Sequence, residues 1–500
     1  MKKEILKKKT IFGLLWSFTD IFARQGIQFI VLMILARILT PEQFGIIGMI
    51  AVFIAISNSI IDSGFSQALI REKKVKKDEY STVFFFNFIM SLTIYLILYN
   101  LSPAISKFFG EESLIIIIRV LSLGVIINSL GIIQKVFLVK KIDFKTQSII
   151  SLASSSLAGV VAITLAVKGY GVWSLVAQSL TQQTIQTVLL WAISKWTPVL
   201  VFKFDFIKSL FKFSSKLLVS GLIDTIYSNI YSIIIGRFYP AAQLGYFTNA
   251  LKLSNVITTT ITSALQRVTY PVLSSIREDE NQLKSVYQKI ITLSVYCMFP
   301  IMVGLIAIAD SLIPILLGPK WSNSIVYFKL LCIAGMIYPL HAINLNILQV
   351  KGRSDLFLRL EIIKKAMLTL LIGGAMLFFT GIIGIIIAAT ISSYLSLFIN
   401  TYYSAREISY STFQQLRDIL PSLIVSTIMG LLVYFVGLLL PDNNWIRLII
   451  QFCFGILFYG IIGWMFKLRE FIYCYGELVH YIKLLRKKLI KSKGTYNYDN

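Results

Sequence analysis

Apolar runs of about 20 residues recur along the whole length of this 500-residue chain. A helix needs about 20 apolar residues to cross a hydrocarbon core roughly 30 Å thick, so each run can span a bilayer. Hydrophobic residues make up 56% of the chain and charged residues 14%, whereas a soluble domain carries roughly a quarter charged residues. The sequence therefore predicts an all-α integral membrane protein.

The apolar runs predict about fourteen transmembrane helices. Six helices form an N-terminal lobe over residues 1–200, six form a C-terminal lobe over 201–404, and a final pair occupies 405–466. The first run is too long for a signal-peptide core and lacks a small-residue cleavage site, so we expect it to be retained. The expected helices cover residues 11–39, 43–70, 80–101, 114–138, 146–168, 171–194, 214–238, 244–270, 288–310, 325–350, 360–380, 382–403, 418–440 and 445–466.

Lysine and arginine fall on alternate connecting segments. The first nine residues carry five lysines, and the segment 71–79 carries five cations. Because cytoplasmic loops are rich in Lys and Arg, we expect both termini in the cytoplasm and the protein in the inner membrane. This placement accounts for the net charge of +24, so we expect no nucleic-acid partner. The opposite loops hold only single cations, which are Arg37, Lys107, Lys168, Arg237, Lys320 and Arg447.

The tail over residues 467–500 is basic and carries apolar residues at helical spacing. This pattern suits an amphipathic helix on the anionic cytoplasmic leaflet, and the alternative is a solvated basic helix. The apolar positions are Leu468, Phe471, Ile472, Tyr475, Leu478, Val479, Ile482 and Leu485.

Two pairs of segments indicate an internal repeat. The sequence ARILTPEQFG at 36–45 resembles GRFYPAAQLG at 236–245, and six of 23 positions are identical between 119–141 and 329–351. Two matches in the same order favour a duplication of six helices. Six is even, so both copies have the same orientation, and the substrate site is expected between two lobes related by an axis along the membrane normal.

Several expected helices carry polar residues three or four positions apart, which places those residues on one helical face. A charge at the bilayer centre costs roughly 2.5–3.5 kcal/mol, so such faces are expected to line a wet cavity. The candidate substrate-binding residues are Asp20, Arg24, Gln28, Asn58, Asp62, Asp224, Ser228, Lys252 and Asn255.

Arg24 is the candidate that matters most. A guanidinium presents a fork of donors that matches phosphate oxygens, so Arg24 could hold a diphosphate. The alternative is a structural ion pair with Asp20, Asp62 or Asp224. The sequence leaves both interpretations open.

No motif points to catalysis or to a cofactor. The chain has no nucleotide-binding loop and no recognisable pair of nucleophile and base, so we expect no enzyme activity and no cofactor. The two histidines and four cysteines lie without metal-site or disulfide spacing, so no metal site is expected. Short outward loops argue against a glycan polymerase.

Arg37 and Arg237 have a structural explanation. Each closes a helix before a tight turn, and in the first turn Thr40 can cap the next helix and Pro41 suits its first residue.

Five segments carry a resemblance to a known family. They are ARILTPEQFG (36–45), IDSGFSQALIREKK (61–74), GYGVWSLVAQ (169–178), RVTYPVLSSI (267–276) and INLNILQVKGRSD (343–355). With them the chain resembles, over essentially all of its length, the polysaccharide-transporter (O-antigen flippase) family of the multidrug/oligosaccharidyl-lipid/polysaccharide exporter superfamily.

The resemblance implies fourteen helices and the translocation of a polyprenyl-diphosphate-linked oligosaccharide from the inner to the outer leaflet, for lipopolysaccharide, capsule or exopolysaccharide biosynthesis. It also implies a lipid-linked glycan and membrane lipids as partners, with a glycan polymerase and a coupling cation as further candidates. A cation-coupled multidrug exporter of the same superfamily is the alternative.

Overall fold

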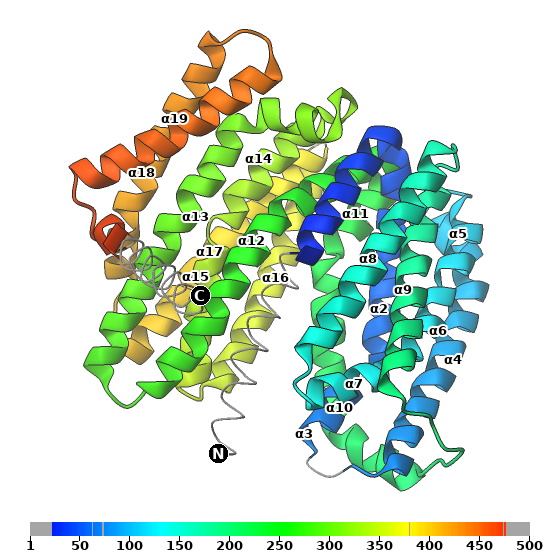
Figure 1. The fold of residues 1–500 in the computed structure, drawn as a ribbon. Coiled ribbons are helices and arrows are strands. Elements are labelled where there is room, and N and C mark those ends of the chain that lie inside the picture. The colour runs from blue at the N-terminus through cyan, green and yellow to red at the C-terminus, as the bar shows by residue number, and fades with distance from the viewer. Residues whose placement is uncertain (1–22, 63, 73–74, 380, 474, 477–500) are drawn as a thin grey trace, which may run out of the picture. The chain divides into compact units, whose positions relative to one another are not determined.

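The computed structural model describes residues 23–62, 64–72, 75–379, 381–473 and 475–476, and all regular elements among them are helices (Figure 1). In this described part, nine helical stretches are long and apolar enough to cross a membrane, and a bent helix pair is a further candidate. The protein is therefore an all-α, multi-pass membrane protein, which confirms the predicted fold class. The number of fourteen spans stays a prediction.

The helices form two packing units, each with its own interior. The first unit comprises residues up to Val256 with Leu316–Tyr327 and Phe379–Ile385. Its elements are helical residues 23–38, α2 (Pro41–Asp62), α3 (Phe65–Arg71), α4 (Lys77–Phe109), α5 (Leu114–Leu121), α6 (Leu123–Ser129), α7 (Ile132–Lys140), α8 (Phe144–Val167), α9 (Val172–Ser194), α10 (Phe204–Ser228), α11 (Ile230–Phe238), the start of α12 (Ala241–Ser275) and the short 3-10 helix η1 (Pro319–Trp321).

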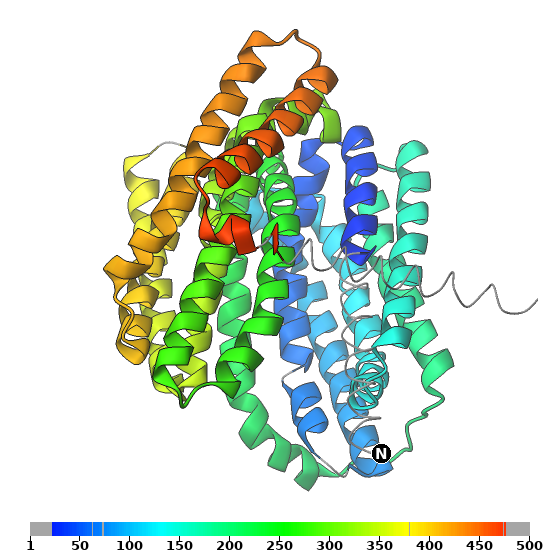
Figure 2. The ribbon, with the colours of Figure 1, turned by 60° about the vertical axis from the view of Figure 1, so that its left-hand side comes forward.

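The second unit comprises the remaining residues, Ile257–Ile315, Phe328–Phe378 and from Ile386 onward. Within it, α18 and α19 form a helical hairpin, and both views show the two helices side by side (Figures 1 and 2). Its elements are the rest of α12, α13 (Glu280–Leu317), α14 (Ser324–Gly335), α15 (Tyr338–Val350), α16 (Ser354–Phe378), α17 (Ile382–Ile408), α18 (Thr412–Leu439) and α19 (Asn444–Met465). Both units are sets of contacting helices, whereas the predicted lobes are copies of a repeat, so the lobe boundaries stay predictions.

Four expected helices are present but fall outside the nine apolar stretches. They are the helix over residues 23–38, α9, α12 and α16. The first is described only from residue 23, and the other three carry several glutamines, threonines or charged residues. A helix this polar cannot face lipid over its whole length, so its polar face must meet protein or water.

The two copies of the expected repeat meet where α2 and α12 begin. A methyl group added to Gly45 would lie 1.8 Å from the carbonyl oxygen of Ala241, and one added to Gly245 would lie 1.9 Å from that of Pro41. The contacts are reciprocal, because each glycine of one copy touches the first helical residue of the other. Only a residue without a side chain permits so close an approach of two backbones.

The two repeat-related arginines each bind the last carbonyl groups of a helix. Arg37 Nε donates to the carbonyl of Leu316, the penultimate residue of α13, at 3.4 Å. Arg237 donates to the carbonyl of Phe108 near the end of α4 at 2.6 Å. A cation at a helix carboxyl end satisfies free carbonyl groups and opposes the helix dipole. This agrees with the structural explanation of both arginines.

Trp321 fixes η1 against the turn that precedes α2. The indole is fully buried, and its Nε1 donates to the carbonyl of Ala36 at 2.8 Å. Lys320 Nζ donates to the carbonyl of Arg37 at 3.0 Å, and burial lowers the pKa of this ammonium group. In the turn itself, the side chain of Gln43 accepts from the N–H of Thr40 at 3.0 Å, which is one half of a capping box.

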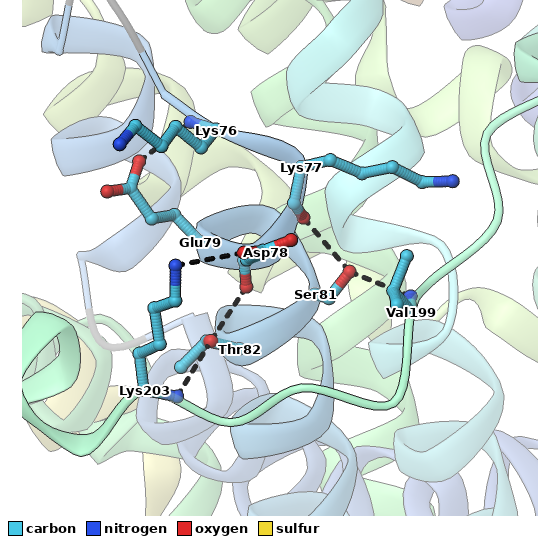
Figure 3. Close-up of polar contacts among 8 residues, drawn as sticks. All are labelled: Lys76, Lys77, Asp78, Glu79, Ser81, Thr82, Val199 and Lys203. Atoms are coloured by element: carbon cyan, nitrogen blue, oxygen red, sulfur yellow. Dashed lines mark hydrogen bonds and ion pairs between the residues drawn. The ribbon is translucent and has the colours of Figure 1, made fainter.

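A polar clamp ties the connection between α9 and α10 to the start of α4 (Figure 3). The backbone N–H of Val199 donates to Ser81 Oγ at 2.9 Å, and that of Lys203 donates to Thr82 Oγ1 at 3.1 Å. The ammonium of Lys203 also pairs with Asp78 at 2.9 Å. The clamp fixes the segment that joins the two predicted lobes.

The interior of the second unit holds a buried polar network. Tyr287 donates from its hydroxyl to Asn344 Oδ1 at 2.9 Å, and Ser404 donates to the same oxygen. Nearby, His341 lies 3.3 Å from Ser393 Oγ and 3.0 Å from Asn400 Nδ2 through its two ring nitrogens. Such contacts satisfy buried polar groups and fix α15 against α13 and α17.

Candidate functional site

Eight of the nine candidate substrate-binding residues lie in the first unit, and Asp20 lies outside the described residues. Helix α2 is the centre of this unit, because α4, α5, α6, α9, α10 and α11 all pack against it (Figure 1). The eight residues are Arg24 and Gln28 on the helix over residues 23–38, Asn58 and Asp62 on α2, Asp224 and Ser228 on α10, and Lys252 and Asn255 on α12.

Arg24 carries a buried polar atom without a hydrogen-bond partner. Its Nε is shielded from solvent, and no hydrogen bond from it reaches another described residue. Among the described residues no ion pair joins Arg24 to Asp62 or to Asp224. A buried, unsatisfied donor costs roughly 1–3 kcal/mol, and more when it is charged. The Nε–H group can therefore donate to an anionic partner without first breaking a hydrogen bond to a described residue.

Asp62 is also incompletely satisfied. Its Oδ1 is buried without a hydrogen-bond partner among the described residues. Asp224 lies on α10, which packs against α2, and a methyl group at Gly221 of α10 would lie 3.5 Å from Ser59 Oγ. Asp62 and Asp224 each follow this contact by three residues, or about one helical turn. The two carboxylates therefore flank one helix crossing.

Asn58 belongs to a polar contact that the sequence did not reveal. The amide of Asn128 on α6 donates to Asn58 Oδ1 at 2.9 Å. This bond joins one predicted site residue to a helix in which no site residue was predicted. Gln28, Asp224 and Ser228 are exposed to the surroundings of the unit, as polar residues that line a wet space would be.

Lys252 lies close to the glycine crossing of α2 and α12. Its ammonium is 5.6 Å from the centre of the Phe44 ring, within the range of a cation–π contact. Asn255, three residues further along α12, is half-buried. Lys252 thus provides a second cation in the same unit as Arg24.

Helix α9 supplies polar residues that the sequence interpretation overlooked. Gln182 donates to Ser155 Oγ of α8 at 3.3 Å, and Gln183 lies so close to Gly124 of α6 that a methyl group there would be 2.6 Å from its amide oxygen. Thr187 donates to a carbonyl of α6 at 3.0 Å. The run QSLTQQTIQT at 178–187 was the available signal, because it makes α9 too polar to face lipid.

The candidate residues and their polar neighbours on α6 and α9 therefore include two cations, two carboxylates and several amides within the first unit. A guanidinium can bind phosphate oxygens, and amides can donate to or accept from sugar hydroxyl groups. Such a mixture suits a polar, partly anionic ligand better than an apolar cation. Among the described residues, no group of three or more His, Cys, Asp or Glu could hold a metal ion.

Comparisons with known proteins agree with this architecture. The teichuronic acid biosynthesis protein TuaB of Bacillus subtilis (strain 168) is 26% identical over 354 residues, which covers 70% of this chain and 73% of TuaB. The lipopolysaccharide biosynthesis protein WzxC of Escherichia coli (strain K12) is 24% identical over 439 residues, which covers 85% of this chain and 88% of WzxC. The solved structure of the lipid II flippase MurJ, in an inward closed conformation, has a TM-score of 0.70 at 16% identity and covers 92% of this chain and 100% of MurJ.

The fold and its polar interior define a multi-pass membrane protein with the fold of MurJ. Residues 34–326, more than half of the chain, match the polysaccharide biosynthesis protein family. The chain belongs to this family, which confirms the resemblance seen in its sequence.

Proposed function

We propose that the protein is a flippase that moves a polyprenyl-diphosphate-linked oligosaccharide from the inner to the outer leaflet of the cytoplasmic membrane by alternating access. The observation that carries the proposal is the buried, unpartnered Nε of Arg24 within a polar membrane unit. The names of WzxC and MurJ associate relatives of the same fold with lipopolysaccharide biosynthesis and with lipid II flipping. A diphosphate is the anionic group that such cargo would present to Arg24.

The same reasoning favours a transporter without enzyme activity. The charged loops favour an inner-membrane protein with both termini in the cytoplasm. A glycan polymerase that uses the flipped product, and a coupling cation, are proposed partners. The mixed charge of the site argues against the multidrug exporter, because a cationic drug would favour a site dominated by carboxylates.

The test is a deletion strain complemented with wild-type protein or with Arg24→Ala. Without the protein, lipid-linked glycan should accumulate on the cytoplasmic face and surface glycan should be lost. Arg24→Ala should reproduce both effects at normal protein abundance, because the buried Nε makes no hydrogen bond to the described residues that the substitution would break.

Lys168→Ala, which removes an exposed cation at the end of α8 outside the candidate residues, is the matched control and should keep wild-type surface glycan. Unchanged surface glycan and no trapped intermediate in the deletion strain would refute the proposal. A change in drug susceptibility instead would favour the exporter.

A further inference from the structure

A polar cavity opens at one end of the second unit, between α13, α18 and the segment that follows α19. Its volume is about 630 Å³. The N-terminal parts of α13 and α18 and residues 466–473 form its walls, at the end where the cation-rich connections lie. The cavity is therefore expected at the cytoplasmic interface of the membrane, and it is remote in the sequence from every candidate substrate-binding residue.

Four cations line this cavity, and none forms an ion pair with another described residue. They are Lys289, Arg417, Lys467 and Arg469. Lys289 lies over the ring of Tyr473, with its ammonium 3.5 Å from the ring centre. Cations gathered in one cavity repel one another, and an anion bound between them relieves this repulsion.

The two acidic residues of the cavity do not neutralise this charge. Asp418 already accepts hydrogen bonds from Gln288, at 2.6 Å, and from the hydroxyl of Tyr410. Together with Glu470 it leaves a net charge of +2 on the cavity walls, from four cations minus two carboxylates. Carboxylates beside cations suit an anion that also carries hydroxyl groups, because carboxylate oxygens accept from hydroxyls.

Lys467 occupies a backbone conformation that glycine would adopt more easily. Its φ angle is +47°, and the N–H of Leu468 bonds back to the carbonyl of Gly463 at 3.1 Å, which completes the turn that ends α19. Glycine is the usual residue at this position of a helix end. Lysine at this position places its side chain in the lining of the polar cavity.

A second, apolar cavity of about 390 Å³ is lined by α13, α18, α19 and Phe471. It is lined on α13 by residues from Tyr296 to Ile308, a length of about 18 Å at 1.5 Å per residue. One leaflet of the hydrocarbon core is roughly 15 Å thick. Phe471 lines the apolar cavity while its neighbours line the polar one, so the two cavities share this segment.

We propose that this pair of cavities binds an anionic phospholipid of the cytoplasmic leaflet. The four cations hold the phosphodiester, Asp418 and Glu470 receive hydroxyl groups of a polyol headgroup, and one acyl chain enters the apolar cavity. The bound lipid bridges α13 to the α18–α19 hairpin and fixes the start of the basic tail. The lipid is a resident of the site and not the transported cargo, and the proposal rests only on the expected orientation of the chain.

The test uses the full-length protein purified in a neutral detergent. Phosphatidylglycerol should bind, as measured by native mass spectrometry, and should raise the melting temperature, whereas phosphatidylcholine with the same acyl chains should do neither. Lys467→Gly and Arg417→Gln should each weaken phosphatidylglycerol binding about fivefold, since a cation near an anionic lipid contributes on the order of 1 kcal/mol.

Lys195→Gly is the matched control. Lys195 also has a positive φ angle, +52°, at the end of a helix, but it lies outside both cavities. The variant Lys195→Gly should therefore relieve the same backbone strain and keep wild-type lipid binding. Equal stabilisation by the two lipids, or wild-type binding by both cavity variants, would overturn the proposal. Selective binding of a polyprenyl diphosphate through Arg417 would assign the cavity to the cargo and overturn it as well.

Discussion

The glycine crossing of α2 and α12 gives the sharpest prediction, through the substitution Gly45→Ala. The added methyl carbon would lie 1.8 Å from the carbonyl oxygen of Ala241, whereas carbon and oxygen atoms normally approach no closer than about 3.3 Å. The two helices must therefore separate by about 1.5 Å. The obstacle is backbone, so no change of rotamer can relieve the clash.

The expected loss of stability follows from this displacement. Overpacking of a well-packed interior costs typically 1–3 kcal/mol, and a clash with backbone belongs at the upper end. Alanine gains back about 1 kcal/mol over glycine in a helix interior. We therefore expect Gly45→Ala to destabilise the protein by about 2 kcal/mol, which should lower the melting temperature by about 2 °C for a chain of 500 residues.

The second glycine of the crossing provides a further test of the same contact. Gly245→Ala should cost a similar amount, because its methyl carbon would lie 1.9 Å from the carbonyl oxygen of Pro41. Once one substitution has separated the helices, the second methyl group fits into space already opened. The double variant should therefore lose clearly less than the sum of the two single losses.

The assay is thermal unfolding of the purified protein. The folded fraction that remains after heating is measured by size-exclusion chromatography. Gly373→Ala on α16 is the matched control, because nothing lies within 4 Å of the added methyl group. This control should be neutral or slightly stabilising through helix propensity. Wild-type stability in Gly45→Ala, or losses that simply add in the double variant, would refute the inferred crossing.

The remaining predictions concern hydrogen bonds and the site. Trp321→Phe should cost about 1–2 kcal/mol, because it removes the bond to the carbonyl of Ala36 while keeping most of the ring packing, and thermal unfolding should show the loss. Ser81→Ala should cost about 1–2 kcal/mol, because the N–H of Val199 loses its acceptor, and a proteolytic cut in the linker should become faster. Arg24→Lys should restore little of the transport lost in Arg24→Ala, because an ammonium lacks the planar fork of donors, and surface glycan measures the rescue.

Hydropathy predicted where helices exist better than where they break. The expected helix 43–70 is interrupted after Asp62, and Gly64, with φ +71°, starts α3. A methyl group at Gly64 would lie 2.9 Å from Leu217, so packing against α10 fixes the break. The bend of 43° between α10 and α11 also lies within one apolar run. Hydropathy depends on side chains alone and carries no information about the backbone hydrogen bonds that such breaks interrupt.

The candidate site stays a prediction, and the sequence reveals its charged residues more readily than its neutral ones. Charged residues such as Arg24 and Asp62 were recognisable, because a charge within an apolar run is costly and rare. Asn128 and Gln183 were not, because a single uncharged amide costs little and is common in membrane helices. Only the structure shows that Asn128 on α6 contacts Asn58 and that Gln183 on α9 lies against Gly124.

The expected repeat pairs Gly45 with Gly245, and the structure places these two glycines in one contact. The recurrence of Gly45 at Gly245 predicted equivalent positions, but not that these positions would touch. Residues on a twofold axis meet their own equivalents, so the same small residue serves both sides of one contact. Arg37 and Arg237 also make equivalent contacts. Arg37 binds the end of α13, and Arg237 binds the end of α4. Gly45 and Gly245 lie in the same contact, so a substitution at either one changes the space open to the other, and the non-additive outcome for the two glycines tests this contact.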